Sequence, residues 1–180
     1  MLVCAFWPLP SSAADTRFPT RYDDQIRSAV RHYWAGVPDW TWWKAQLYQE
    51  SQLDPNAESQ VGAAGLAQFM PGTWADISRQ MGFEGVSPKV ARYAIEAGAY
   101  YMAQLRRSWV ADRPPMEKHR LAQASYNAGT GHILEAQQIC RDARMWDQIK
   151  PCLAQITGPG NARQTIDYVD HIARWQEMMR

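Results

Sequence analysis

One acidic residue, Glu50, stands at the end of an aromatic segment whose spacing suggests chemistry. The segment reads DWTWWKAQLYQES, and a helix over residues 39–50 would place four side chains on one face: Trp40, Trp43, Leu47 and Glu50. Because an apolar setting disfavours a charged carboxylate, we expect the pKa of Glu50 to lie well above the unperturbed value of about 4.3. A carboxyl group that keeps its proton near neutral pH can protonate a glycosidic oxygen. The competing interpretation is a glutamate that simply ends a surface helix.

Two sequence blocks around and beyond Glu50 favour the chemical interpretation. The first, YQESQLDPNAESQVGAAGLAQFMPGTW, runs from Tyr48 to Trp74, and the second, LAQASYNAG, occupies residues 121–129. Together they resemble the signature of the soluble lytic transglycosylase catalytic domain, which belongs to the goose-type lysozyme superfamily. The resemblance extends from about Tyr22 to Ile172. It implies an all-α, or nearly all-α, lysozyme-like single domain.

The resemblance assigns family motif positions to individual residues. The family's Glu-Ser pair is Glu50-Ser51, and its downstream serine and Gly-Ala turn are Ser59 and Gly62-Ala63. The Gly-Leu-Met-Gln block is present as residues 65–68, with Ala67 where the family has methionine. These positions make Glu50 the expected catalytic acid, while Ser51 could equally be a local helix-end hydroxyl.

The implied reaction is cleavage of the β-1,4 bond between N-acetylmuramic acid and N-acetylglucosamine, with formation of a 1,6-anhydro ring. Ordinary glycosidases use two carboxyl groups at a defined separation. Three acids are candidates for the second, but none lies in a convincing motif: Asp54, Glu58 and Asp76. A scheme in which Glu50 is first acid and then base therefore fits better. Two alternatives stay open: a goose-type lysozyme that hydrolyses the same bond, and a weakly active wall-binding component of a phage or secretion apparatus.

The resemblance also implies side chains that contact the substrate, each with a plainer structural alternative. Gln68 and Met70 would line the sugar-binding groove, although methionine more often packs in a core. Ser59 would hydrogen-bond the reacting sugar or the catalytic carboxyl group. The hydroxyl group of Tyr126 would point at the developing oxocarbenium centre or hold Glu50. Asn127 is either a substrate contact or a structural cap.

A third motif lies near the C-terminus. The sequence RQTIDYV resembles the family's Glu-Thr-x-x-Tyr-Val element, with Tyr168 at the tyrosine position. Gln164 stands where glutamate is usual, so this chain lacks an acidic group there. Tyr168 is therefore a further candidate at the edge of the groove, and the catalytic acid is not affected.

Composition restricts the partners. The chain has 180 residues and a formal net charge of +1, whereas nucleic-acid-binding domains are usually far more basic. No apolar run reaches the roughly 20 residues that a membrane-spanning helix needs. The four histidines, at positions 32, 119, 132 and 171, are scattered, so we expect no metal site and no cofactor. The expected partner is the peptidoglycan glycan strand, and a secretion or phage assembly remains open.

The N-terminus and the cysteines concern export. Residues 1–19 are expected to be a truncated signal peptide or a disordered segment, followed by the catalytic domain over residues 20–180. A wall substrate and an export signal together predict a periplasmic or other extracytoplasmic location. In an oxidising compartment Cys140 and Cys152 would form a disulfide, and the alternative is two free thiols.

The hydrophobic pattern predicts helices almost throughout, with no convincing alternation of period two. A loop is expected over residues 51–64, where Asp54-Pro55-Asn56 indicates a turn. The longest helix should begin near Ser87-Pro88, and its small residues 97–99 predict close packing against another helix. The other expected helices lie near residues 22–33, 39–50, 65–70, 73–81, 116–127, 132–140 and 166–179.

Overall fold

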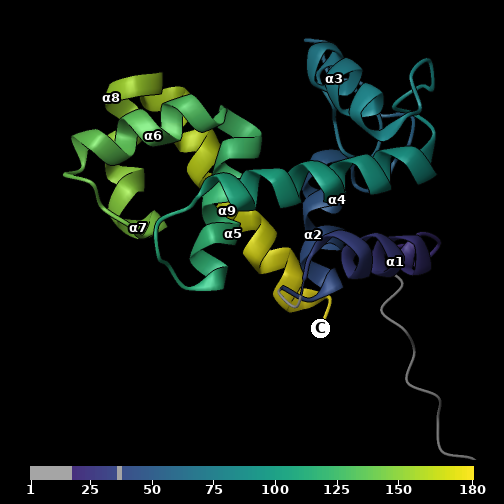
Figure 1. Ribbon diagram of the computed structural model, residues 1–180, viewed down its shortest axis with the longest axis horizontal. Helices are drawn as coiled ribbons and strands as arrows, with labels where there is room; N and C mark the ends of the chain where they lie inside the picture. The colour runs from purple at the N-terminus through teal and green to yellow at the C-terminus, as the bar shows by residue number, and fades with distance from the viewer. Residues whose placement is uncertain (1–17, 36–37) are drawn as a thin grey trace, which may run out of the picture.

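The computed structural model describes residues 18–35 and 38–180, and Figure 1 shows that these residues form a helical molecule. The leader predicted over residues 1–19 therefore lies outside the described residues, apart from its last two. No strand occurs in the described ranges, so the all-α prediction is confirmed. The helices are α1 (Asp23–Tyr33), α2 (Trp40–Ser51), α3 (Pro71–Met81), α4 (Ala91–Ser108), α5 (Pro115–Ala128), α6 (Thr130–Ile139), α7 (Trp146–Ile149), the 3-10 helix η1 (Lys150–Cys152), α8 (Leu153–Thr157) and α9 (Pro159–Met178).

Helix α2 lies between two apolar cores. Trp43 and Leu47 are fully buried in the first core, together with residues of α1, α3 and α4. Ala45 points into the second core, which α5 to α9 build. In Figure 1 the two groups of helices lie on opposite sides of the view, and α9 runs beside α2. This arrangement fixes the direction of α2, at whose C-terminal end Glu50 stands.

The small residues of α4 allow it to approach α2 closely. A Cβ atom added to Gly98 would lie 2.4 Å from the Trp43 ring, so no larger residue fits without a shift. The Trp43 indole then donates a hydrogen bond to the Ile95 carbonyl at 3.1 Å. The close packing predicted from residues 97–99 is thus present, and its partner is a tryptophan of α2.

Residues 65–70 form a tight turn and not the predicted short helix. Ala64 and Phe69 exchange two backbone hydrogen bonds, each 3.0 Å long. Gly65 and Gln68 both have left-handed backbone conformations, with φ of 78° and 46°, which cannot propagate a right-handed helix. A Cβ atom at Gly65 would also lie 2.0 Å from the Pro88 carbonyl oxygen, so this position requires glycine.

Two other differences concern helix boundaries. Helix α4 begins at Ala91, after an N-cap at Val90, and the Ser87 hydroxyl instead accepts a bond from the Lys89 amide at 3.2 Å. The predicted N-cap at Ser87 was therefore wrong by about one turn. The short helices α7, η1 and α8 were not predicted, because segments of three to five residues carry no readable period. Among the described residues, no helix is both long enough and apolar enough to cross a bilayer.

Candidate active site

The site is built around the C-terminal end of α2, which is tied to the following loop. The Ser51 hydroxyl donates hydrogen bonds to the carbonyls of Leu47 and Leu66, at 3.2 and 2.9 Å. Gln52 and Leu53 then adopt left-handed conformations, with φ of 53° and 62°, which turn the chain away sharply. The helix therefore stops one residue after Glu50, and its last turn is held in place by the loop.

Glu50 has the environment expected of a carboxylic acid. It is partly buried, and burial raises its pKa from 4.5 to about 8. The Tyr168 hydroxyl donates a hydrogen bond of 2.5 Å to Glu50 Oε1, which acts in the opposite direction because it stabilises the carboxylate. At neutral pH the carboxyl group therefore keeps its proton, and the Tyr168 hydroxyl can stabilise the carboxylate that forms when the proton is lost.

Tyr126 lies on the α5 side of the same carboxyl group. Its hydroxyl donates a hydrogen bond of 2.7 Å to the Ala67 carbonyl, so it anchors the turn over residues 65–70 to α5. Burial and the nearby Glu50 carboxylate both raise the pKa of Tyr126 well above its usual value. The same two causes raise the pKa of Tyr168. Both tyrosines are therefore neutral hydrogen-bond donors at any physiological pH.

Glu50 opens onto a cavity of about 340 Å³ between α2, α5 and α9. A second cavity of about 390 Å³ adjoins it, since Asn127 and Gln164 line both. The two cavities together form a groove along α9 that is lined mainly by polar side chains. Besides Glu50, the first cavity is lined by Gln49, Asn127, Gln164, Asp167, Tyr168 and His171.

The C-terminal motif holds two parts of this groove together. The Thr165 hydroxyl donates a hydrogen bond of 2.8 Å to Asn127 Oδ1, which joins the end of α5 to α9. One turn further along α9, Tyr168 reaches Glu50. The Thr-x-x-Tyr spacing thus puts the two side chains about one turn apart on α9, where Thr165 bonds to α5 and Tyr168 bonds to the candidate acid. Gln164 is exposed and lines both cavities, so the position where the family has glutamate faces the groove.

The loop residues make their hydrogen bonds within the loop. Ser59 Oγ accepts a bond of 2.9 Å from the Ala63 amide. The Gln68 side chain donates to the carbonyls of Ala57 and Gly65, at 3.1 and 3.0 Å. Neither residue lines the cavity at Glu50, and their contacts with a sugar stay a prediction.

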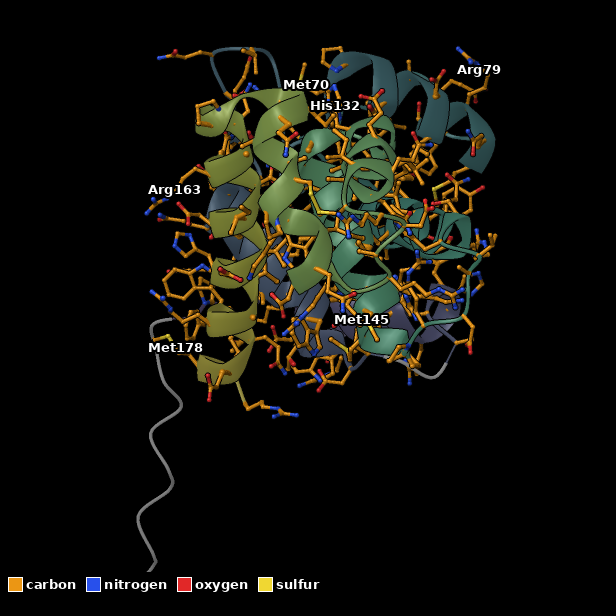
Figure 2. The ribbon with its side chains drawn as sticks, turned by 90° about the vertical axis from the view of Figure 1, so that its left-hand side faces the viewer. Met70, Arg79, His132, Met145, Arg163 and Met178 are labelled. Atoms are coloured by element: carbon orange, nitrogen blue, oxygen red, sulfur yellow. A yellow bond between two sulfur atoms is a disulfide. The ribbon has the colours of Figure 1, made fainter. Side chains whose placement is uncertain are left out.

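Met70 is 45% exposed and directly precedes α3. Figure 2 shows Met70 at the same end of the molecule as His132, which lines the second cavity. An exposed thioether is consistent with a ligand contact and not with core packing, the plainer alternative for this residue. Its contact with a sugar likewise remains a prediction.

Three lining residues were not predicted: Gln49, Asp167 and His171. Gln49 precedes Glu50, and its Oε1 atom accepts a bond of 2.9 Å from the Trp175 indole. Asp167 and His171 follow Gln164 at three and seven residues, which places all three on one face of α9. The spacing of three and seven residues from Gln164 is therefore the sequence signal that identifies Asp167 and His171 as groove residues.

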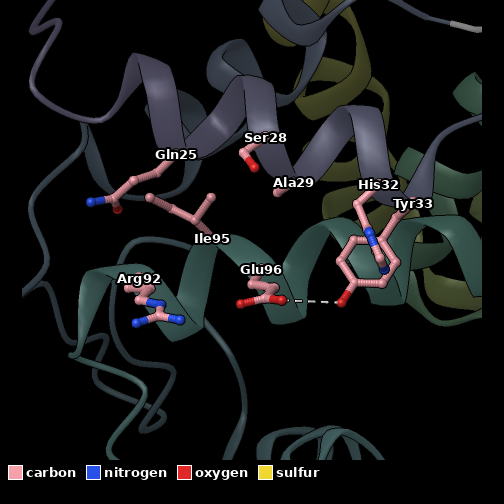
Figure 3. Close-up of a pocket in the computed structure, with 8 residues that line it drawn as sticks. All are labelled: Gln25, Ser28, Ala29, His32, Tyr33, Arg92, Ile95 and Glu96. Atoms are coloured by element: carbon pink, nitrogen blue, oxygen red, sulfur yellow. Dashed lines mark hydrogen bonds between the residues drawn. The ribbon is translucent and has the colours of Figure 1, made fainter.

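A separate cavity of about 270 Å³ lies between α1 and α4, as Figure 3 shows. There the Tyr33 hydroxyl donates a hydrogen bond of 3.3 Å to Glu96 Oε1, and burial and Glu96 raise the pKa of Tyr33 to about 12. None of the motif residues lines this cavity. The motif residues Glu50, Asn127 and Tyr168 line the groove instead, which makes it the candidate site.

Cys140 and Cys152 are joined by a disulfide, with their Cα atoms 5.9 Å apart. The bond links the end of α6 to η1, and so it fixes the second core beside the groove. Within the described ranges, no group of three or more histidine, cysteine or acidic side chains is arranged to hold a metal ion.

Comparison with known proteins identifies the class. Residues 39–149 match the family model described as the transglycosylase SLT domain, and the chain belongs to this family. The chain is 31% identical to a membrane-bound lytic murein transglycosylase F of Desulfosudis oleivorans, over 92% of this chain and 37% of the relative. It is 29% identical to the protein of the same name from Shewanella woodyi, over 93% and 35%. The chain thus spans about a third of the length of these relatives.

Solved structures agree on the fold. An inactive glutamate-to-glutamine mutant of the lytic transglycosylase Slt from Pseudomonas aeruginosa superposes with a TM-score of 0.71 and 26% identity, over 92% of this chain and 25% of that one. The 70 kDa soluble lytic transglycosylase of Escherichia coli superposes with a TM-score of 0.65 at 22% identity, over 88% and 25%, which supports the fold alone. The lysozyme-like fold is thereby confirmed.

Proposed function

We propose that this chain is the catalytic domain of a peptidoglycan lytic transglycosylase, with Glu50 as its only catalytic carboxyl group. The observation that carries the proposal is the Glu50 carboxyl group itself. It has a pKa of about 8, accepts a hydrogen bond from Tyr168 and faces a polar groove. Relatives that carry the name lytic murein transglycosylase support the substrate class, which is peptidoglycan.

In the first step Glu50 donates its proton to the glycosidic oxygen, and the bond from that oxygen to C1 of N-acetylmuramic acid breaks. The N-acetyl oxygen of the same sugar stabilises C1, as in substrate-assisted glycosidases. Glu50 is then a carboxylate, and the hydrogen bond from Tyr168 stabilises its charge.

In the second step the Glu50 carboxylate removes the proton from the C6 hydroxyl group. The C6 oxygen attacks C1, and the 1,6-anhydro ring closes. The proton is returned to Glu50, so the enzyme is regenerated and no water is consumed. One residue is acid and then base, which suits a pKa close to the working pH.

The three acids considered as a second catalytic carboxyl group all lie in other contacts. Glu58 forms an exposed ion pair with Lys89 at 2.6 Å, and Asp76 forms one with Arg79 at 3.4 Å. Asp54 accepts a bond of 2.9 Å from the Asn56 amide in an exposed turn. None of them lines the cavity at Glu50. Asp167 does line it, but this carboxylate is partly exposed and accepts a bond of 3.4 Å from Arg163 Nε one turn earlier on α9. The surroundings therefore favour the single-acid scheme.

The remaining groove residues are proposed to bind the glycan. Asn127 and Tyr168 lie at the cavity, Tyr126 fixes the turn beside it, and Gln68 and Met70 belong to the segment leading into α3. Since peptidoglycan lies outside the cytoplasm, the proposed site of action is extracytoplasmic. The Cys140–Cys152 disulfide is compatible with such a compartment.

Mass spectrometry of the muropeptides released from purified peptidoglycan tests the reaction. We expect anhydro ends, which are lighter than reducing ends by one water. A digest that contains only reducing ends would show a hydrolase and overturn the proposal. In the same assay Glu50→Gln should lose activity by about a hundredfold to ten-thousandfold, since the amide is of similar shape but cannot donate the proton.

A further inference from the structure

Between the two apolar cores lie polar side chains that the proposed chemistry does not use. Gln46, His119 and Gln123 are completely buried. The Gln46 carbonyl oxygen, both amide atoms of Gln123 and both ring nitrogens of His119 have no hydrogen-bond partner among the described residues. Buried polar atoms are almost always paired with protein groups or with ordered water, so this group requires an explanation.

The register of α2 against α5 places the two glutamines opposite each other. At one end the rings of Trp42 and His119 are 5.6 Å apart. At the other end Glu50 lies close enough to Tyr126 for its charge to raise the pKa of that phenol. The numbering rises along both helices between these contacts, at 1.5 Å per residue. Gln46 lies four residues after Trp42 on α2, and Gln123 lies four residues after His119 on α5. The two glutamines are therefore at the same height along the two helices.

Gln46 is also connected to the candidate acid. Gln46 and Glu50 are four residues apart on α2, so their side chains lie on one face of the helix. Tyr168 approaches that face from α9 and donates to Glu50. The Gln46 Nε2 group donates one proton to Met102 Sδ at 3.4 Å, which leaves its second proton for the Tyr168 oxygen. Hydrogen bonding from Gln46 acts to lower the pKa of Tyr168, because it stabilises the phenolate. The Gln46 amide therefore contacts Glu50 indirectly, because Gln46 donates to Tyr168 and Tyr168 donates to Glu50.

We propose that Gln46 and Gln123 bind an internal water molecule and that this water holds the Gln46 amide against Tyr168. Gln46 and Gln123 are thus positioning residues, which act on Glu50 through the Tyr168 hydroxyl group. A buried water typically makes about three hydrogen bonds to otherwise unpaired groups, and the two amides offer three such atoms. The inference depends on the proposed function only in treating Glu50 as the reacting group.

The physical effect follows from the direction of the hydrogen bonds. When Gln46 donates to the Tyr168 oxygen, it polarises the phenol and makes its hydroxyl a better donor to Glu50. A better donor stabilises the carboxylate and lowers the pKa of Glu50. The titratable groups that face Glu50 are Tyr126 from α5 and, from α9, Tyr168, Asp167 and His171. Neither glutamine carries charge, so an effect of their removal is transmitted by hydrogen bonding.

The test is an NMR titration of the Glu50 carboxyl carbon in ¹³C-labelled protein, assigned with Glu50→Gln. It is applied to Gln46→Met, Gln123→Met and the double variant, because methionine preserves the shape and removes the amide. The matched control is Gln176→Met, a buried glutamine of α9 whose amide is already paired with the Thr41 hydroxyl at 3.0 Å. Thermal unfolding of each variant is followed in parallel. Neither readout requires activity, so the result is independent of the reaction proposed above.

We expect Gln46→Met to raise the titration midpoint of Glu50 by about half a pH unit, and Gln123→Met to raise it by less. The double variant should not exceed Gln46→Met, because both residues act through the same amide. Both Gln46→Met and Gln176→Met should lower the unfolding temperature, because each leaves a buried partner unpaired, but Gln176→Met should leave the midpoint unchanged. An unchanged midpoint in Gln46→Met, additive shifts in the double variant, or an equal shift in the control would each overturn the proposal. Should Gln46→Met not fold, Gln123→Met decides alone by the presence or absence of its shift.

Discussion

The raised pKa of Glu50 predicts that Glu50→Gln stabilises the protein at alkaline pH. In the folded state the pKa is about 8, against 4.5 for an unperturbed carboxyl group. A raised folded-state pKa means that folding binds a proton. The stability contributed by the neutral carboxyl group is therefore fully present below pH 4.5 and is lost as the pH rises through about 8. Glutamine imitates the neutral form at every pH, so it escapes this loss.

The magnitude follows from the same shift. A rise of the pKa from 4.5 to about 8 corresponds to an upper limit of roughly 4–5 kcal/mol. Glu50 is only partly buried, and solvent reduces the effect, so we expect about 2–4 kcal/mol. In a domain of this size that difference corresponds to roughly 4–16 °C in the unfolding temperature.

The assay compares thermal and denaturant unfolding of the wild type and Glu50→Gln at pH 5 and at pH 9. The two proteins should be nearly equal at the lower pH, and the variant should be the more stable one at the higher pH. Glu58→Gln provides the control, since Glu58 is exposed and its pKa is lowered by Lys89, so it should gain no alkaline advantage. Parallel pH dependence of the wild type and Glu50→Gln would refute the buried-acid argument.

Three further predictions follow from the geometry. Tyr168→Phe removes the donor that stabilises the Glu50 carboxylate, so the alkaline limb of the pH–activity profile should move up by about one unit while the maximum rate falls at least about tenfold. The double replacement of Cys140 and Cys152 by serine should cost about 2–4 kcal/mol in denaturant unfolding, whereas the wild type should lose this amount only under reducing conditions. Gly98→Ala places a methyl group against Trp43, and calorimetry should show a loss of about 1–3 kcal/mol with no change in the pH profile of activity.

The sequence predicted those features of the fold and the site that depend on the spacing of residues within one helix. Periodicity located the major helices, and the sequence Ala97-Gly98-Ala99 indicated a close helix contact before the partner was known. The face shared by Trp43, Leu47 and Glu50 predicted the direction of the pKa shift of Glu50, which desolvation causes in the structure. Such local features depend on neighbours within one helix, and these can be read from spacing.

Features that depend on distant segments could not be read in this way. The turn over residues 65–70 looked helical because its apolar residues suit a helix, but Gly65 must pass against the Pro88 carbonyl. Tyr168 and Glu50 are 118 residues apart, and only the packing of α9 on α2 brings them together. The burial of Gln46 and Gln123 at the same height between α2 and α5 could likewise not be predicted, since each glutamine alone resembles a surface residue.

The environment of Glu50 reconciles two opposed requirements of the proposed reaction. A carboxyl group in a fully apolar pocket would keep its proton but would be a poor proton donor, because nothing would stabilise the carboxylate that remains. A carboxyl group with several donors would ionise far below neutral pH and would have no proton to give. Glu50 has burial on one side and a single strong donor, Tyr168, on the other, while the Tyr126 hydroxyl is engaged by the Ala67 carbonyl. Its pKa of about 8 therefore lies close to neutral pH, where one group can donate a proton in the first step of the proposed reaction and accept one in the second.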